Sequence, residues 1–186
     1  MSTDTLITEL GQTQNLVLAL AEDADEATLR AQYHPDLSAL GWHLGHCVFT
    51  DCLWLHEKIR GDDSVTAPIA DFYTPPNVPK HRRGALLPPR DALLTWAREL
   101  QQFNLHYLRN LRPELQQHPL LQDDYLVHFL IQHNSQHYET MVMGLTQKAL
   151  AEYEENAAID QRLQPAGLDG ERVEIAAGHY QVGGDQ

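Results

Sequence analysis

Three histidines of this sequence, His46, His133 and His137, have the residue type and spacing of metal ligands. His133 and His137 are four residues apart in a segment with helical periodicity, so their side chains lie one turn apart on one face. This face also carries Leu126 and Met141 and is therefore expected to be buried. Imidazole nitrogen binds iron, zinc, nickel and copper, and a pair at this spacing can fill two adjacent coordination positions.

His46 lies in a second helical segment, in the middle of an apolar stripe that includes Phe49 and Leu53, with His43 on its flank. Burying an imidazole without a partner costs about 1–3 kcal/mol. One shared metal ion would explain why two apolar faces both carry histidine. Three protein ligands would leave open positions, as in catalytic rather than structural metal sites. We therefore predict a metal site formed by His46, His133 and His137.

A structural alternative remains open for these residues, because core histidines are often satisfied by a carbonyl, a carboxylate or a buried water. For Trp42, Phe49 and Trp54 we expect a packing role. The remaining histidines are expected to be exposed or in loops; they are His34, His56, His81, His106, His118, His128 and His179.

Helical periodicity dominates the first 150 residues and predicts four long helices, at about 3–20, 38–60, 90–112 and 123–153. Ser38 is the expected N-cap of the second helix, and Gly61 ends it. The segment 62–89 holds six of the ten prolines and is predicted to be a long loop, functional or wrapped around the body. The fold class is therefore all-α, an up-down four-helix bundle. Residues 154–172 resemble a linker, and 173–186 alternate briefly in polarity like a short, unfinished β segment.

The net charge of −13 argues against a nucleic-acid partner and against docking on an anionic membrane surface. The sequence contains no apolar run long enough to span a bilayer, and its first residues lack the features of a signal peptide. Cys47 and Cys52 diverge on the predicted helix, so we expect no disulfide between them and a cytoplasmic location.

Two motifs carry a family resemblance. Residues 38–61, SALGWHLGHCVFTDCLWLHEKIRG, resemble the S-P-x-x-W-[DH]-L-[AG]-H pattern of the DinB-like domain in ergothioneine-biosynthesis sulfoxide synthases. Residues 132–144, QHNSQHYETMVMG, resemble the Q-H-x-x-Q-H-x-E-T pattern of the same family. Residues 173–184, VEIAAGHYQVGG, are similar to the first strand of that family's second, formylglycine-generating-enzyme-like domain.

This resemblance implies a DinB/YfiT-like metal-binding domain at 1–153, a linker at 154–172 and the start of a truncated second domain at 173–186. It implies one non-haem Fe(II) held by His46, His133 and His137. The family uses O₂ to join a thiol to the imidazole of Nα-trimethylhistidine as a sulfoxide. Gln136 matches a position that contacts the histidine-derived substrate, and Arg82 and Arg83 resemble arginines that bind the donor's carboxylates.

Two departures leave the thiol or selenol donor open among cysteine, γ-glutamylcysteine and a selenosugar. His43 replaces the aspartate of many family members, as in the branch that accepts a selenosugar, and Ala39 replaces proline. The missing second domain is expected to come from another chain if the site is to be complete. Two other functions also remain open: a stand-alone DinB-like thiol S-transferase that uses zinc or nickel, and a non-catalytic metal-binding helical bundle.

Overall fold

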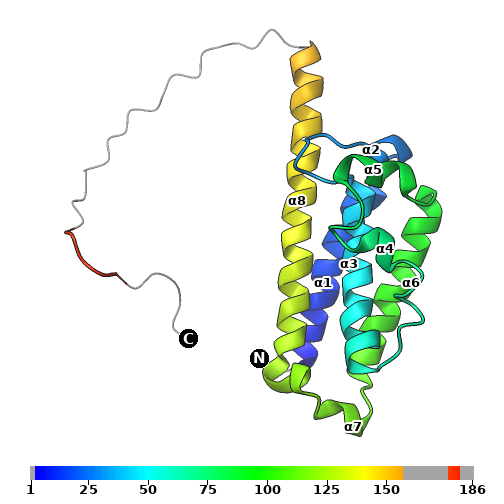
Figure 1. Ribbon diagram of the computed structural model, residues 1–186, viewed down its shortest axis with the longest axis vertical. Helices are drawn as coiled ribbons and strands as arrows, with labels where there is room; N and C mark the ends of the chain where they lie inside the picture. Colours follow the sequence, from blue (N-terminus) through cyan, green and yellow to red (C-terminus); the bar gives the residue numbers. More distant parts are fainter. Residues whose placement is uncertain (1–2, 157–175, 181–186) are drawn as a thin grey trace.

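Four long helices packed side by side form the body of the protein in the computed structural model, which describes residues 3–156 and 176–180 (Figure 1). They are α1 (Thr3–Glu22), α3 (Leu40–Cys52) continued by the π-helix η1 (Leu53–Ile59), α6 (Arg90–Arg109) and α8 (Tyr125–Asn156). No strand occurs in the described part of the chain. The predicted all-α four-helix bundle is therefore confirmed.

The helices run up, down, down and up in chain order. His56, near the end of η1, bonds to Asn104, near the end of α6, so α3 and α6 point the same way. α8 runs opposite to α3, because His43 is paired with His137 and His46 with His133. The connection between η1 and α6 must therefore return along the whole length of the bundle, as Figure 1 shows. This return explains its length.

The connection is more ordered than the predicted loop at 62–89. It contains α4 (Ala70–Tyr73), α5 (Lys80–Arg83) and the 3-10 turn η2 (Gly84–Leu86). Arg30, at the end of α2 (Glu26–Arg30), holds it in place by donating to the carbonyls of Gly84, Leu87 and Pro88 at 3.0, 2.9 and 2.9 Å. A side chain at Gly84 would place its Cβ 1.8 Å from the Arg30 oxygen, so glycine is required for this close approach.

Several helix boundaries differ from the sequence prediction. The N-cap of α3 is Ala39, without a side-chain cap, and the hydroxyl of Ser38 instead accepts a hydrogen bond from Arg83 at 2.6 Å. Beyond η1, Gly61 adopts a positive φ of 72°, which explains why the predicted helix ends there. The α6–α8 connection contains α7 (Pro113–Gln116) and the 3-10 turn η3 (Pro119–Asp124), so the last helix begins at Tyr125.

A layer of polar side chains separates two apolar clusters in the core. The first cluster surrounds Leu44, Val48 and Met141, and the second surrounds Leu10, Leu55 and Leu130. Between them, the buried carboxylate of Asp51 accepts hydrogen bonds from Gln14 at 2.7 Å and Asn134 at 3.1 Å. Burial raises the pKa of Asp51 to about 7, although both hydrogen bonds oppose this shift. The layer thus joins α1, α3 and α8 through one titratable group.

The C-terminal expectations are only partly covered by the structure. Residues 154–156 belong to α8, which therefore extends slightly beyond the predicted end at 153. Residues 176–180 are exposed and contain a bend but no strand, whereas the rest of the predicted linker and β segment, 157–175 and 181–186, lies outside the described residues. In the described part of the chain, no helix has the length and apolar character needed to cross a membrane.

Candidate metal centre

The structure brings the three predicted ligands together. His46 projects from α3, while His133 and His137 project from α8, and each offers a nitrogen that lies within 4.8 Å of the other two. The ring centroids are 5.1 Å apart for His46 and His133, 4.8 Å for His46 and His137, and 4.6 Å for His133 and His137. Among the described residues, this is the one group of histidine, cysteine and acidic side chains with such a geometry.

The environment of His46 determines which of its nitrogens is available. Its Nδ1 donates a hydrogen bond to the backbone carbonyl of Tyr73 at 2.8 Å, and its ring stacks on Trp42 with centroids 4.8 Å apart. In a neutral imidazole, a proton on Nδ1 leaves Nε2 unprotonated. The Nε2 of His46 therefore presents its lone pair toward His133, as metal coordination requires.

Burial keeps the three imidazoles neutral. It lowers the pKa of His133 to about 4, with a further contribution from His46. It lowers the pKa of His137 to about 2, where the neighbouring histidines add to the effect. Burial is also the main reason why the pKa of His46 is lowered. The hydrogen bond to Tyr73 partly opposes this shift, and the charge of Arg83 adds to it. Neutral imidazole is the protonation state that binds metal, so the site needs no proton release at neutral pH.

The spacing of the nitrogens fits a single ion. Metal–imidazole bonds of about 2.0–2.1 Å place two neighbouring ligand nitrogens about 2.9–3.4 Å apart. The Nε2 atoms of His46 and His133 are 3.3 Å apart, and the Nδ1 of His133 has no hydrogen-bond partner in the described structure. Two facing imidazole nitrogens with no other polar contact are well explained by one cation between them.

His43 is closer to the centre than its position on the helix flank indicated. It is 5% exposed, and its Nδ1 lies 2.9 Å from the Nδ1 of His137. Burial, followed by the charges of His46, Arg83 and Lys80, lowers the pKa of His43 to about 3. His43 is not a member of the three-histidine set within 4.8 Å.

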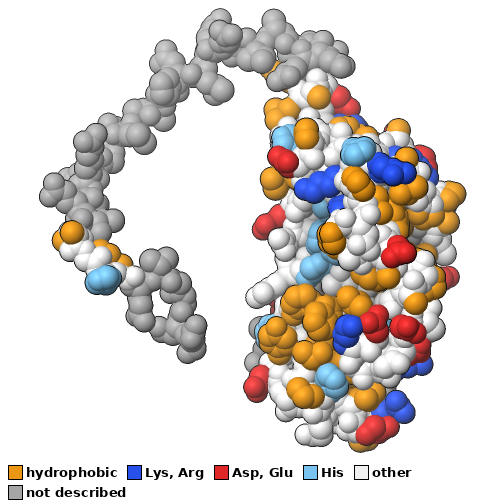
Figure 2. Space-filling model, in the orientation of Figure 1, with side chains coloured by type: hydrophobic (Ala, Val, Ile, Leu, Met, Phe, Trp, Pro, Cys, Tyr) orange, Lys and Arg blue, Asp and Glu red, His pale blue; other side chains and the backbone are white. Residues whose placement is uncertain are grey.

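A cavity of about 470 Å³ opens beside the histidines, and Figure 2 shows histidine side chains near basic residues that gather over α5. Arg83 forms part of its wall, with its guanidinium 3.7 Å above the ring of Trp42 and hydrogen bonds to Ser38 and to the carbonyls of Val78 and Pro75. The complete lining comprises Asp36, Ser38, Trp42, His43, His46, Pro75, Pro76, Lys80, Arg83, His137 and Thr140. The cavity therefore combines metal-binding nitrogens, an aromatic wall and positive charge.

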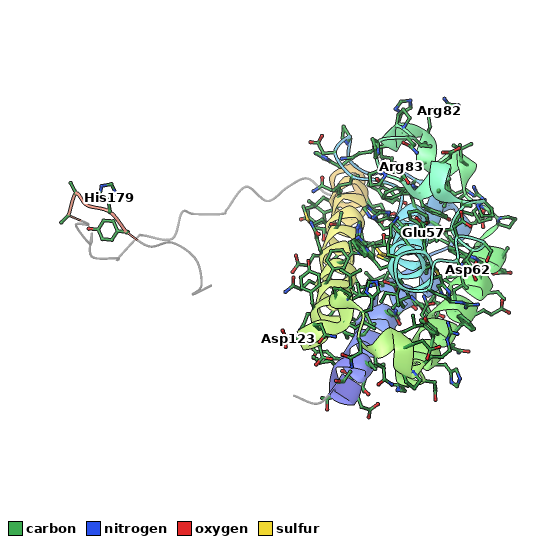
Figure 3. All side chains as sticks on the ribbon, turned by 60° about the horizontal axis from the view of Figure 1, so that its bottom comes forward. Glu57, Asp62, Arg82, Arg83, Asp123 and His179 are labelled. Carbon is green, nitrogen blue, oxygen red and sulfur yellow. The ribbon has the colours of Figure 1, made fainter. Side chains whose placement is uncertain are left out.

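The other predicted substrate-binding residues are placed differently. Arg82 is exposed at the outer end of the molecule, whereas the neighbouring Arg83 is buried (Figure 3). Gln136 is exposed on α8, and neither Arg82 nor Gln136 lines the cavity. Contact of these two residues with a substrate remains a prediction.

Two site features had not been found from the sequence. Tyr73 supplies the carbonyl that orients His46, although it belongs to a segment predicted to be a loop. Its ring packs against Gly45, where an added Cβ would lie 2.3 Å from the ring. Nothing in the local sequence pattern pairs residue 73 with residue 46, because the contact depends on how the long connection returns.

The histidines expected to be exposed or in loops include one exception. His56 is 1% exposed, and its Nε2 lies 2.7 Å from the Asn104 side-chain oxygen. Its ring stacks between those of Phe103 and Tyr107. The prediction for His56 was wrong, because α6 packs against this side of the helix: Asn104 contacts both His56 and Cys52, which lies four residues earlier.

Comparison with known proteins identifies the family. No curated protein sequence matches the chain. The model of the DinB superfamily matches residues 9–141, well over half of the chain, and this range contains all three clustered histidines. The chain therefore belongs to the DinB superfamily.

Proposed function

We propose that this chain binds one divalent metal ion through His46, His133 and His137 and that it is the iron-binding part of an O₂-dependent sulfoxide synthase. The convergence of three neutral imidazoles beside an open cavity carries the metal part of this proposal. The choice of Fe(II), and of Nα-trimethylhistidine and a thiol as substrates, rests on the resemblance of the two histidine motifs to the ergothioneine type.

The residues around the cavity have distinct parts in this function. The hydrogen bond from His46 to Tyr73 fixes the tautomer that coordinates. Arg83 and Lys80 place positive charge at the cavity, where it would attract the carboxylates of a thiol donor or of a histidine derivative. Iron(II) bound at the histidines would supply the redox chemistry that O₂ requires.

The proposed reaction balances without an external reductant. One sulfur–hydrogen bond of the thiol and one ring carbon–hydrogen bond of Nα-trimethylhistidine are broken. A carbon–sulfur bond and a sulfur–oxygen bond are formed, and the second oxygen atom leaves as water with the two hydrogens. The donor would be cysteine or γ-glutamylcysteine; with a selenosugar, the selenium–hydrogen bond would break instead, and carbon–selenium and selenium–oxygen bonds would form. We further propose that a formylglycine-generating-enzyme-like domain, from this chain or another, completes the pocket.

The three-imidazole ligand set also favours a second function, that of a metal-dependent thiol S-transferase. Three neutral imidazoles with open positions also suit zinc or nickel, which would activate a thiol as thiolate for transfer. A DinB-type thiol S-transferase would use the same residues without O₂. A bundle that binds metal without catalysis would give no turnover with either metal.

The test is to load the protein anaerobically with Fe(II), and separately with Zn(II), and to supply a thiol with Nα-trimethylhistidine and O₂ or with an electrophilic thiol acceptor. O₂-dependent sulfoxide, detected by mass spectrometry with iron only and strengthened by adding the second domain, supports the iron proposal. Thiol transfer to an electrophile that depends on zinc and not on O₂ would overturn it in favour of the transferase. The matched control, His133→Ala, should lack both activities.

A further inference from the structure

His43 makes a contact with His137 that packing alone does not explain. Its Nδ1 and that of His137 are 2.9 Å apart, which is hydrogen-bond distance between two neutral imidazoles. Both side chains lie at the cavity, and His43 is 5% exposed. One of the two nitrogens must donate and the other must accept.

The direction of this hydrogen bond determines whether His137 can bind metal. If His43 donates from Nδ1, His137 accepts at Nδ1 and must carry its proton on Nε2, so neither of its nitrogens has a free lone pair. If His137 donates from Nδ1, its Nε2 is unprotonated and free to coordinate. With this hydrogen bond kept, metal binding by His137 through Nε2 therefore requires that His43 be the acceptor.

We infer that His43 is a positioning residue, which accepts the Nδ1–H of His137 and so holds that imidazole in the coordinating tautomer and orientation. This inference rests on the proposed metal site and assigns to it a residue beyond its three ligands. Metal-bound histidines usually donate their second N–H to a carboxylate, carbonyl or water, and His46 does so to Tyr73. At His137 a neutral imidazole takes the acceptor's place.

The arrangement has a consequence for the cavity. When His43 accepts at Nδ1, its own proton is on Nε2, and this nitrogen is buried with no hydrogen-bond partner in the described structure. A buried donor without an acceptor is unfavourable by about 1–3 kcal/mol. A water or an oxygen atom of a molecule bound in the adjoining cavity would relieve this cost.

The tautomers can be observed directly in the zinc-loaded full chain labelled with ¹⁵N-histidine. Long-range ¹H–¹⁵N spectra, assigned by single substitutions, should show His137 protonated at Nδ1 with Nε2 bound to zinc, and His43 protonated at Nε2 and not bound. A proton on Nδ1 of His43, or a zinc-bound nitrogen in His43, would overturn the inference.

Zinc affinity gives a second, independent test with two variants. In His43→Asn the amide oxygen replaces Nδ1 as the acceptor, so zinc affinity should stay within about threefold of the parent protein. His43→Leu has similar bulk but no acceptor and should lose about 10–100-fold. His128→Asn, on the exposed face of the same helix as His137, is the matched control and should have no effect.

Each result decides between the possible roles of His43. Equal affinity for His43→Leu and the parent would show that His43 does not position His137. Loss of stoichiometric binding in both variants, with the helical circular dichroism intact, would make His43 a ligand and also overturn the inference. A parent protein that binds no zinc, cobalt or iron would instead refute the proposed metal site, and with it this role for His43.

Discussion

The helix formed by α3 and η1 carries two buried histidines, His46 and His56, whose ring nitrogens have different surroundings. The Nε2 of His46 faces the Nε2 of His133, on α8, at 3.3 Å. His56, one turn before the end of η1, instead forms a hydrogen bond of 2.7 Å with the side-chain oxygen of Asn104. Asn104 in turn contacts the sulfur of Cys52 at 3.5 Å.

The difference shows that burial alone does not identify a metal ligand. His56 is more completely buried than His46, yet an uncharged side-chain acceptor satisfies its Nε2. Around His46, nitrogens from two helices converge with lone pairs that only a proton or a cation can satisfy. We therefore expect the two buried histidines to respond differently to substitution: His46 and its neighbours should control metal affinity, and His56 should control stability.

The largest expected effect is on metal binding. Alanine at His46, His133 or His137 should each abolish stoichiometric binding of Co(II) or Zn(II), because two imidazoles cannot hold the ion in this geometry. His56→Ala should retain full stoichiometry. Equilibrium dialysis with metal analysis measures both. If His46→Ala still bound one equivalent of metal, His46 would not be a ligand, and its contrast with His56 would fail.

The next effect concerns stability. His56→Ala should lower the free energy of unfolding by about 2–4 kcal/mol, because it leaves a cavity between Phe103 and Tyr107 and removes the partner of the buried Asn104. Urea denaturation of the metal-free protein gives this value. His128→Ala, at an exposed position, should change it by less than about 0.5 kcal/mol. A similarly small change for His56→Ala would show that its contacts do not stabilise the bundle.

The metal-free protein should lose stability as the pH falls below about 6.5. The unfolded chain binds protons on its histidines near pH 6.5, whereas the folded pKa values of His133 and His43 are lowered to about 4 and about 3. Because the unfolded state then holds more protons, each such histidine reduces the free energy of unfolding by up to about 1.4 kcal/mol per pH unit. Denaturation midpoints between pH 8 and pH 4.5 measure the slope. Replacing His133 by Leu should flatten it, and an unchanged slope would contradict its assignment to the buried site.

The smallest effect has the opposite sign and arises in the polar layer. The folded pKa of Asp51 is raised to about 7 from 3.8, so the native state retains a proton that the unfolded chain releases. Its contribution to stability therefore falls as the pH rises from about 4 to 7. Relative to the parent, Asp51→Asn should gain about 1–3 kcal/mol between pH 5 and pH 8. Asp71→Asn, at an exposed residue, should show no such trend.

Much of the bundle and of the candidate site could be predicted from local sequence patterns. The i, i+4 spacing of His133 and His137 and the apolar stripes around them determine which helix faces are buried, because helical periodicity is a property of the chain alone. The same periodicity located His46 on the inner face of α3. These three predictions needed no knowledge of how the helices pack.

Only the tertiary structure decided what lies around those residues. The contacts of Tyr73 with His46, of Arg83 with Trp42 and of His43 with His137 join residues far apart in the sequence. They depend on the return of the 60–89 connection along the bundle and on the packing of α8 against α3, which no local pattern encodes. The burial of His56 has a similar cause: α6 packs against this side of the helix, where Asn104 contacts both Cys52 and His56.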